Sequence, residues 1–189
     1  MTVSMSERLP KVLILPGLGN SGPDHWQSHW ERQDSSCVRL MQDEWDRPDC
    51  FAWTARLDEA VLAASSSLVL AAHSSACALV VHWVARAEPR HLAKVRGALL
   101  VAPSDPDGAN FPEGPTGFGR VPLVRLPFPT IVVGSTNDPY ISAEGARGYA
   151  DAWGSRFVLL ENAGHINVAA GFGPWPDGLQ LLYSLRAPA

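Results

Sequence analysis

The chain has 189 residues, of which 46% are hydrophobic and 18% charged, and its formal net charge at pH 7 is −4. This balance is typical of a globular protein and not of a disordered chain, and the length fits one domain over residues 1–189. The negative charge excludes a broadly basic surface for nucleic acid, and no apolar run reaches the roughly 20 residues of a membrane-spanning helix.

The N-terminus and the cysteines indicate the compartment. Residues 1–10 are polar and lack the apolar core of a secretory signal. The three cysteines, Cys37, Cys50 and Cys77, are odd in number and have no C-x-x-C spacing, which favours free thiols over disulfides or a zinc cluster. We therefore expect a cytoplasmic protein without a bound metal.

Short apolar runs alternate with helix-like stretches along the chain. The apolar runs predict six strands, at residues 11–15, 37–40, 68–72, 95–102, 130–134 and 157–160. Helical spacing predicts helices at residues 24–33, 51–65, 76–87, 143–153 and 176–185. This alternation is typical of an α/β fold in which a mainly parallel sheet carries helices on both faces. Residues 103–129, rich in Pro, Gly and Asp, interrupt it with a segment that is long for a loop and too short for a helical cap domain.

A serine stands between a predicted buried strand and a predicted helix, in the segment Ala72-His73-Ser74-Ser75-Ala76. A strand, a tight turn bearing a serine and a helix form the nucleophile elbow of serine hydrolases. The residues two before and two after the serine must be small, and both are alanine where the usual motif has glycine. The alternative is a plain helix N-cap at Ser74.

Two later loops supply the partners that such a serine needs. Asp138 follows the strand at residues 130–134, and His165 follows the strand at residues 157–160. After the serine, the carboxylate and then the histidine base is the chain order expected for this fold. Asp105, after the preceding strand, is a rival for the acid. His73 lies within the turn itself, and we expect its ring to point away from Ser74, Asp138 and His165.

A glycine-rich loop follows the first strand and begins with Pro16-Gly17-Leu18-Gly19. We predict an oxyanion hole made by the backbone N–H groups of Leu18 and Ser75, with Gly17 allowing a close approach. No G-K-[ST] follows for a phosphate loop, and the third glycine of a dinucleotide motif is missing, so no cofactor is expected.

These motifs resemble those of small serine hydrolases of the retinoblastoma-binding-protein-9 and YdeN type, in the α/β-hydrolase superfamily. The resemblance rests on PGLGNSGPDHW, HSSACA, STNDPY and AGHIN and covers nearly the whole chain. It implies a trimmed α/β-hydrolase fold without a cap domain and the hydrolysis of ester or related acyl bonds. With the first strand predicted from Lys11, we expect this chain to lack the two further strands of larger members.

We therefore expect a carboxylesterase- or thioesterase-like serine hydrolase that cleaves a small-molecule acyl substrate through an acyl-enzyme. Phe111, Phe118 and Leu123 are candidates for an acyl pocket, or they simply anchor the long loop. The sequence indicates no metal, nucleic acid, membrane or protein partner. The alanines of the elbow leave one alternative from another class: a hydrolase-fold protein of low activity that acts mainly by binding a protein partner. Acyl transfer to an acceptor other than water also remains open.

Overall fold

Six parallel strands form one sheet in the order β2-β1-β3-β4-β5-β6. The computed structural model describes residues 9–187, so the expectation of no secretory signal in residues 1–10 falls mainly outside the described residues. All six predicted strands are confirmed, each with bounds within one residue of those expected. They are β1 (Lys11–Leu15), β2 (Cys37–Arg39), β3 (Leu68–His73), β4 (Val95–Val101), β5 (Thr130–Ser135) and β6 (Arg156–Leu160).

The five predicted helices are also present. They are α1 (Trp26–Gln33), α2 (Cys50–Ala63), α3 (Ser75–Val84), α5 (Ala143–Trp153) and α6 (Pro176–Arg186). The short α4 (Pro89–Leu92) and the 3₁₀ turn η1 (Val168–Ala170) were not predicted. Helix α1 begins at Trp26 and not at Asp24, because His25 is extended and its side chain caps the helix by accepting the N–H of Gln27.

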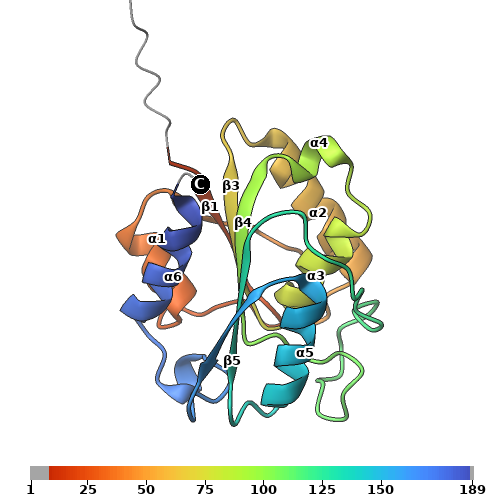
Figure 1. Ribbon diagram of the computed structural model, residues 1–189, viewed down its shortest axis with the longest axis vertical. Helices are drawn as coiled ribbons and strands as arrows, with labels where there is room; N and C mark the ends of the chain where they lie inside the picture. The colour runs from red at the N-terminus through yellow and green to blue at the C-terminus, as the bar shows by residue number, and fades with distance from the viewer. Residues whose placement is uncertain (1–8, 188–189) are drawn as a thin grey trace, which may run out of the picture.

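The helices cover the two faces of the sheet. Figure 1 shows α1 and α6 together on the left of the sheet and α2, α3 and α5 on the right. Along β3, Leu68 and Leu70 belong to the core on the side of α2 and α3, whereas Val69 and Ala71 belong to the core on the side of α1 and α6. Both faces are buried, which explains why β3 is a continuous apolar run and not an alternating one.

Helix α1 is anchored by tryptophans. Trp26 and Trp30 are both 0% exposed and pack against Trp175, as expected for the packed face of that helix. The Trp26 indole Nε1–H donates to the carbonyl of Ile166 at 2.9 Å. This bond ties α1 directly to the segment that carries His165.

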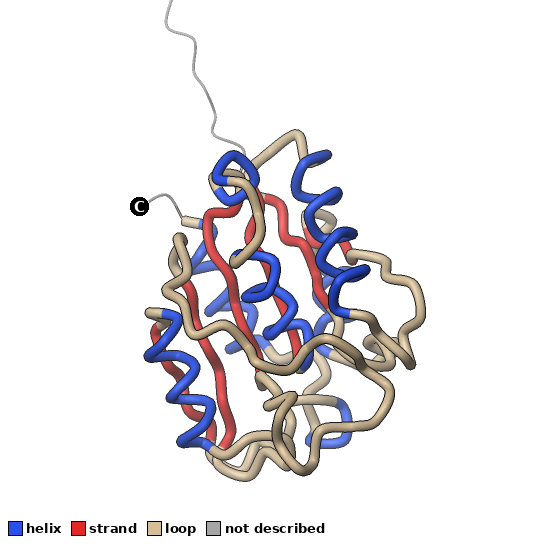
Figure 2. The backbone as a smooth tube through the Cα atoms, turned by 90° about the vertical axis from the view of Figure 1, so that its right-hand side faces the viewer, coloured by secondary structure: helices blue, strands red, loops and turns tan. Residues whose placement is uncertain are grey.

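The carboxyl ends of parallel strands lie at one edge of a sheet, where α/β proteins bind their ligands. Figure 2 shows most of the longer loops gathered at the lower end, where β1 finishes. Between β4 and β5, residues 102–129 contain no helix or strand, so the described part of the chain has no helical cap domain there. None of the helices in residues 9–187 is long and apolar enough to span a membrane.

Candidate active site

Ser74 occupies a strained turn between β3 and α3. Its backbone has φ 58° and ψ −127°, a region that residues other than glycine rarely adopt. Its side chain makes no capping hydrogen bond to α3, so the N-cap alternative does not describe it. Ala72 and Ala76 are both 0% exposed, so a larger side chain at either position would have to displace its neighbours.

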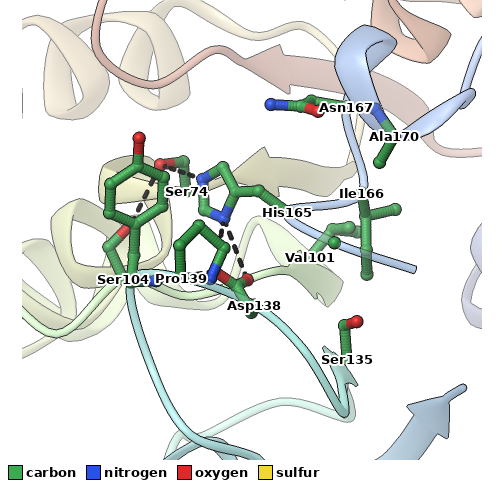
Figure 3. Close-up of polar contacts among 12 residues, drawn as sticks. Ser74, Val101, Ser104, Ser135, Asp138, Pro139, His165, Ile166, Asn167 and Ala170 are labelled. Carbon is green, nitrogen blue, oxygen red and sulfur yellow. Dashed lines mark hydrogen bonds and ion pairs between the residues drawn. The ribbon is translucent and has the colours of Figure 1, made fainter. Parts of the chain in front are cut away.

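The structure brings Asp138, His165 and Ser74 into one line of hydrogen bonds (Figure 3). His165 Nε2 lies 2.8 Å from Ser74 Oγ, and His165 Nδ1 lies 3.0 and 2.9 Å from the two carboxylate oxygens of Asp138. The Asp138 side chain is 0% exposed. Because a carboxylate only accepts, Nδ1 carries the proton of the neutral ring, and Nε2 is left to accept the hydroxyl of Ser74. This is the arrangement that a general base needs.

Asp105 is directed elsewhere. Its carboxylate accepts the N–H of Asp107 at 3.1 Å and the hydroxyl of Tyr149 at 3.4 Å. Its own backbone N–H donates to the carbonyl of Tyr140 at 3.1 Å. Of the two candidate acids, the structure therefore places only Asp138 against His165.

The loop that carries Asp138 and the loop that carries His165 are bonded to each other. Three consecutive polar side chains, from the last residue of β5 onward, accept the N–H groups of three consecutive residues after β6. The bonds run from Asn162 N–H to Thr136 Oγ1 at 2.8 Å, from Ala163 N–H to Ser135 Oγ at 3.0 Å and from Gly164 N–H to Asn137 Oδ1 at 2.7 Å. These bonds hold the loops of Asp138 and His165 against each other.

The prediction that the His73 ring points away from the other site residues is wrong. Its Nε2 lies 2.9 Å from the His165 carbonyl oxygen, and its ring centroid is 4.9 Å from that of His165. The alternation of β3 puts Val69, Ala71 and His73 on the side of α1, which the His165 loop crosses. Burial, and then the neighbouring His165 and His25, hold the pKa of His73 well below 6.5.

The glycine-rich loop touches the turn that carries Ser74, but not as expected in every respect. A Cβ built on Gly17 would lie 2.8 Å from the His73 carbonyl oxygen and 3.0 Å from Ser74 Cβ, so glycine is what permits the contact. The N–H of Leu18 donates to Ser75 Oγ at 3.1 Å, so this expected oxyanion donor is already bonded. Ser75 is the first residue of α3, and its N–H has no acceptor within the helix.

A buried glutamine holds this loop in place. Gln27 is 0% exposed, and its Nε2 donates to the carbonyls of Leu15 at 3.1 Å and Ala71 at 3.0 Å. Its Oε1 accepts the hydroxyl of Ser21 at 2.6 Å. Helix α1 is thus attached to the ends of β1 and β3, on either side of the glycine-rich loop.

A cavity of about 290 Å³ opens above Ser74. Most of the residues that line it are polar, namely Asn20, His25, His73, Ser74, Ser75, Ser104, Tyr140, His165 and Asn167, and Phe111 is among the apolar ones. The other two residues expected at an acyl pocket lie elsewhere. Phe118 is 1% exposed and packs in the core against Trp53, and Leu123 is 66% exposed at the surface. A loop without periodicity does not reveal which of its apolar residues turn inward.

One contact of Ser74 was not predicted from the sequence. Ser104 Oγ lies 3.0 Å from Ser74 Oγ, and Ser104 is 3% exposed. The position just after β4, the strand next to β3, was a signal that could have found it, as it had singled out Asp105. Within residues 9–187, no group of three or more His, Cys, Asp or Glu side chains is placed to hold a metal ion.

The doubly covered parallel sheet, with a strained serine at the end of a central strand, is that of a serine hydrolase of the α/β-hydrolase fold. The model of the serine hydrolase family matches residues 12–184, and the chain belongs to this family. No curated protein matches the chain.

Solved structures agree with this assignment. A protein described as a YdeN-like hydrolase, from Pectobacterium atrosepticum, is 32% identical, with a TM-score of 0.82 over 94% of this chain and 91% of its own. The ydeN gene product of B. subtilis is 18% identical, with a TM-score of 0.70 over 93% of this chain and 98% of its own. Esterase 2 of Thermogutta terrifontis is 15% identical, with a TM-score of 0.68 over 100% of this chain and 89% of its own. At these lower identities the last two show the fold alone. The resemblance seen in the motifs is thereby confirmed.

Proposed function

We propose that this serine hydrolase cleaves small carboxylic esters or thioesters through an acyl-enzyme on Ser74, with His165 as general base and Asp138 as its carboxylate partner. The observation that carries the proposal is the line of hydrogen bonds from buried Asp138 through His165 to Ser74 Oγ. We also propose that residues 1–189 are a single α/β-hydrolase domain, because one sheet includes every described strand.

The proposed reaction has two halves. Ser74 Oγ attacks the substrate carbonyl carbon while its proton passes to His165 Nε2, and the carbonyl oxygen becomes an oxyanion. The oxyanion then collapses, the alcohol or thiol leaves with the proton from His165, and Ser74 keeps the acyl group. Water repeats the sequence and releases the acid. Asp138 accepts the Nδ1–H throughout and stabilises the imidazolium.

We assign the oxyanion to the backbone N–H groups of Ser75 and Leu18. The first sits at the N-terminus of α3, where the helix dipole favours negative charge. The second donates to Ser75 Oγ in the structure. An anionic oxygen is a stronger acceptor than a hydroxyl, so we expect the substrate oxyanion to replace Ser75 Oγ on the Leu18 N–H.

The cavity favours a short acyl group. Its volume of about 290 Å³ is at the low end for small-molecule sites, which leaves little room for a long acyl chain. We expect p-nitrophenyl acetate and butyrate to be hydrolysed with higher kcat/KM than p-nitrophenyl palmitate. A preference for the long chain would contradict a small acyl substrate while leaving the nucleophile unaffected.

The nucleophile is tested with a fluorophosphonate probe and mass-spectrometric mapping of the adduct. Esterase 2 of Thermogutta terrifontis has a structure in which it is phosphorylated by paraoxon, a related reagent. We expect one adduct, on Ser74, and loss of both labelling and ester hydrolysis in Ser74→Ala. The control is Ser155→Ala. The Ser155 hydroxyl bonds the hydroxyl of Thr130 at the amino ends of β5 and β6, the ends opposite those near Ser74. No adduct, or unchanged hydrolysis in Ser74→Ala, would overturn the proposal and favour a protein that acts by binding a partner.

A further inference from the structure

A second serine hydroxyl touches the proposed nucleophile. Ser104 Oγ lies 3.0 Å from Ser74 Oγ (Figure 3). Ser104 is 3% exposed, and among the described residues Ser74 is the only hydrogen-bond partner of its hydroxyl. A buried hydroxyl with a single partner is committed to that partner, because leaving it unpaired costs free energy.

The backbone on both sides of Ser104 is held in place. The N–H of Ala102 donates to the Val133 carbonyl of β5 at 2.8 Å, and the N–H of Asp105 donates to the Tyr140 carbonyl at 3.1 Å. Ala102 has φ 47°, a left-handed conformation that an alanine adopts only when its surroundings impose it. The chain leaves β4 by a sharp turn that delivers Ser104 to the nucleophile.

The direction of the bond follows from counting protons. Asp138 accepts the Nδ1–H of His165, so Nε2 of the neutral ring has a lone pair and accepts the hydroxyl proton of Ser74. Ser74 has no second proton to give. Ser104 is therefore the donor of the bond between the two serines, and Ser74 Oγ is its acceptor.

We propose that Ser104 is a further catalytic residue, whose O–H stabilises negative charge on Ser74 Oγ as the Ser74 proton moves to His165. This inference rests on the proposed function. When Oγ attacks the substrate it loses its proton before its new bond to carbon is complete, and a hydrogen bond to a charged oxygen is stronger than one to a neutral hydroxyl. Ser104 keeps its own proton throughout, so the proton balance of the reaction is unchanged.

The same bond acts again when the acyl-enzyme breaks down. Ser74 Oγ is then the leaving atom, and it carries negative charge until His165 returns the proton. Within the acyl-enzyme, Oγ is an ester oxygen and a weaker acceptor, so the bond from Ser104 is strongest near the two transition states. Interactions of this kind accelerate a reaction because they favour the transition state over the ground state.

Three variants test the proposal: Ser104→Ala, Ser104→Thr and Ser155→Ala. We expect Ser104→Ala to lower the second-order rate of fluorophosphonate labelling about 10- to 100-fold, the loss of one hydrogen bond to a charged group. In stopped-flow reactions with p-nitrophenyl acetate, the rate of the burst phase, which reports acylation, and the steady-state rate should both fall. Ser104→Thr keeps a hydroxyl and should restore part of both rates. Ser155→Ala loses a hydroxyl bonded to the hydroxyl of Thr130 and should keep wild-type rates.

The outcomes separate the two proposals. A Ser104→Ala enzyme that is labelled as fast as wild type, or faster, overturns the role of Ser104 and leaves Ser74 as the nucleophile. A threonine variant no faster than the alanine variant also overturns it, since the hydroxyl is then not what the site lacks. Failure of wild-type Ser74 to react would remove the proposed function and the role of Ser104 with it. Thermal unfolding of Ser104→Ala should match that of Ser155→Ala.

Discussion

His73 donates its Nε2–H to the backbone carbonyl of His165 at 2.9 Å, so the residue before the proposed nucleophile holds the loop of its base. A carbonyl only accepts, which requires the proton of His73 to be on Nε2. The centroid of the His73 ring lies 4.8 Å from that of His25 and 4.9 Å from that of His165. Positive charge on His165 during catalysis is therefore tolerated best when both neighbouring histidines are neutral.

This cluster predicts loss of stability in mild acid. Burial, followed by the charges of Arg39 and His165, lowers the pKa of His25 from 6.5 to about 4, and burial holds that of His73 well below 6.5. The unfolded chain takes up these protons near pH 6.5 and the folded chain does not. The contribution of the two histidines to the free energy of unfolding is therefore fully present above this pH and is lost as the pH drops towards 4. We expect each histidine to contribute a slope of about 1.4 kcal/mol per pH unit in urea unfolding.

His25→Asn provides the matched control for that slope. Asparagine retains a side-chain oxygen to cap α1, replacing the bond from the Gln27 N–H to His25 Nδ1, and it does not titrate. The slope between pH 6.5 and about 4 should fall by the share of one histidine. An unchanged slope would show that His25 is protonated equally in the folded and unfolded chains.

Gly17→Ala should disable the proposed oxyanion hole. The new methyl would collide with the His73 carbonyl and Ser74 Cβ, and the loop that carries the Leu18 N–H must move away. Loss of one oxyanion donor lowers kcat by about 100- to 1,000-fold. Gly22→Ala, in the same loop, is the control, because its methyl would meet nothing within 4 Å and should leave kcat unchanged. Equal activities of the two variants would argue against a role for this loop in the reaction.

The proposed acid is tested by two single substitutions. Asp138→Asn replaces a carboxylate, which only accepts, with an amide whose NH₂ group can donate, so the His165 tautomer is no longer fixed, and the expected fall in kcat is about 10,000-fold. Asp105→Asn alters a carboxylate that bonds Tyr149 and Asp107, so kcat should stay within a few-fold of wild type. Steady-state kinetics with p-nitrophenyl acetate measure both. The reverse ranking would assign the acid to Asp105.

The cysteines should be inert in the folded protein. All three are buried and free, and burial raises the pKa of Cys37 to about 12 and that of Cys50 to about 11 and raises the pKa of Cys77 as well. Iodoacetamide at neutral pH should leave the intact mass and the rate of p-nitrophenyl acetate hydrolysis unchanged, because only the thiolate reacts. In guanidinium all three should be alkylated. Inactivation that tracks alkylation of Cys77 would contradict Ser74 as nucleophile.

Most of the fold could be read from local patterns. A strand that is buried on both faces, such as β3, must be apolar throughout, and Pro and Gly end such runs at positions like Pro16 and Gly17. Helix α4 was missed because its four residues are too short for any periodicity. The start of α1 was misplaced because a histidine, which is not a usual cap, ends the preceding loop and caps the helix.

The site depends on the sequence and on the tertiary structure in different ways. The order of Ser74, Asp138 and His165 after successive strands is a local property, and parallel strands deliver their loops to one edge of the sheet, so the sequence alone brought these residues together as candidates. Distances between loops are not local. Only the packed sheet turns His73 toward His165 and sets Ser104 against Ser74. It also brings the Leu18 N–H to Ser75 Oγ. Phe118 is buried in the core and away from the cavity for the same reason. Each of these contacts joins loops or strand ends far apart along the chain, and their side-chain directions follow from strand register and helix packing, which no single segment specifies.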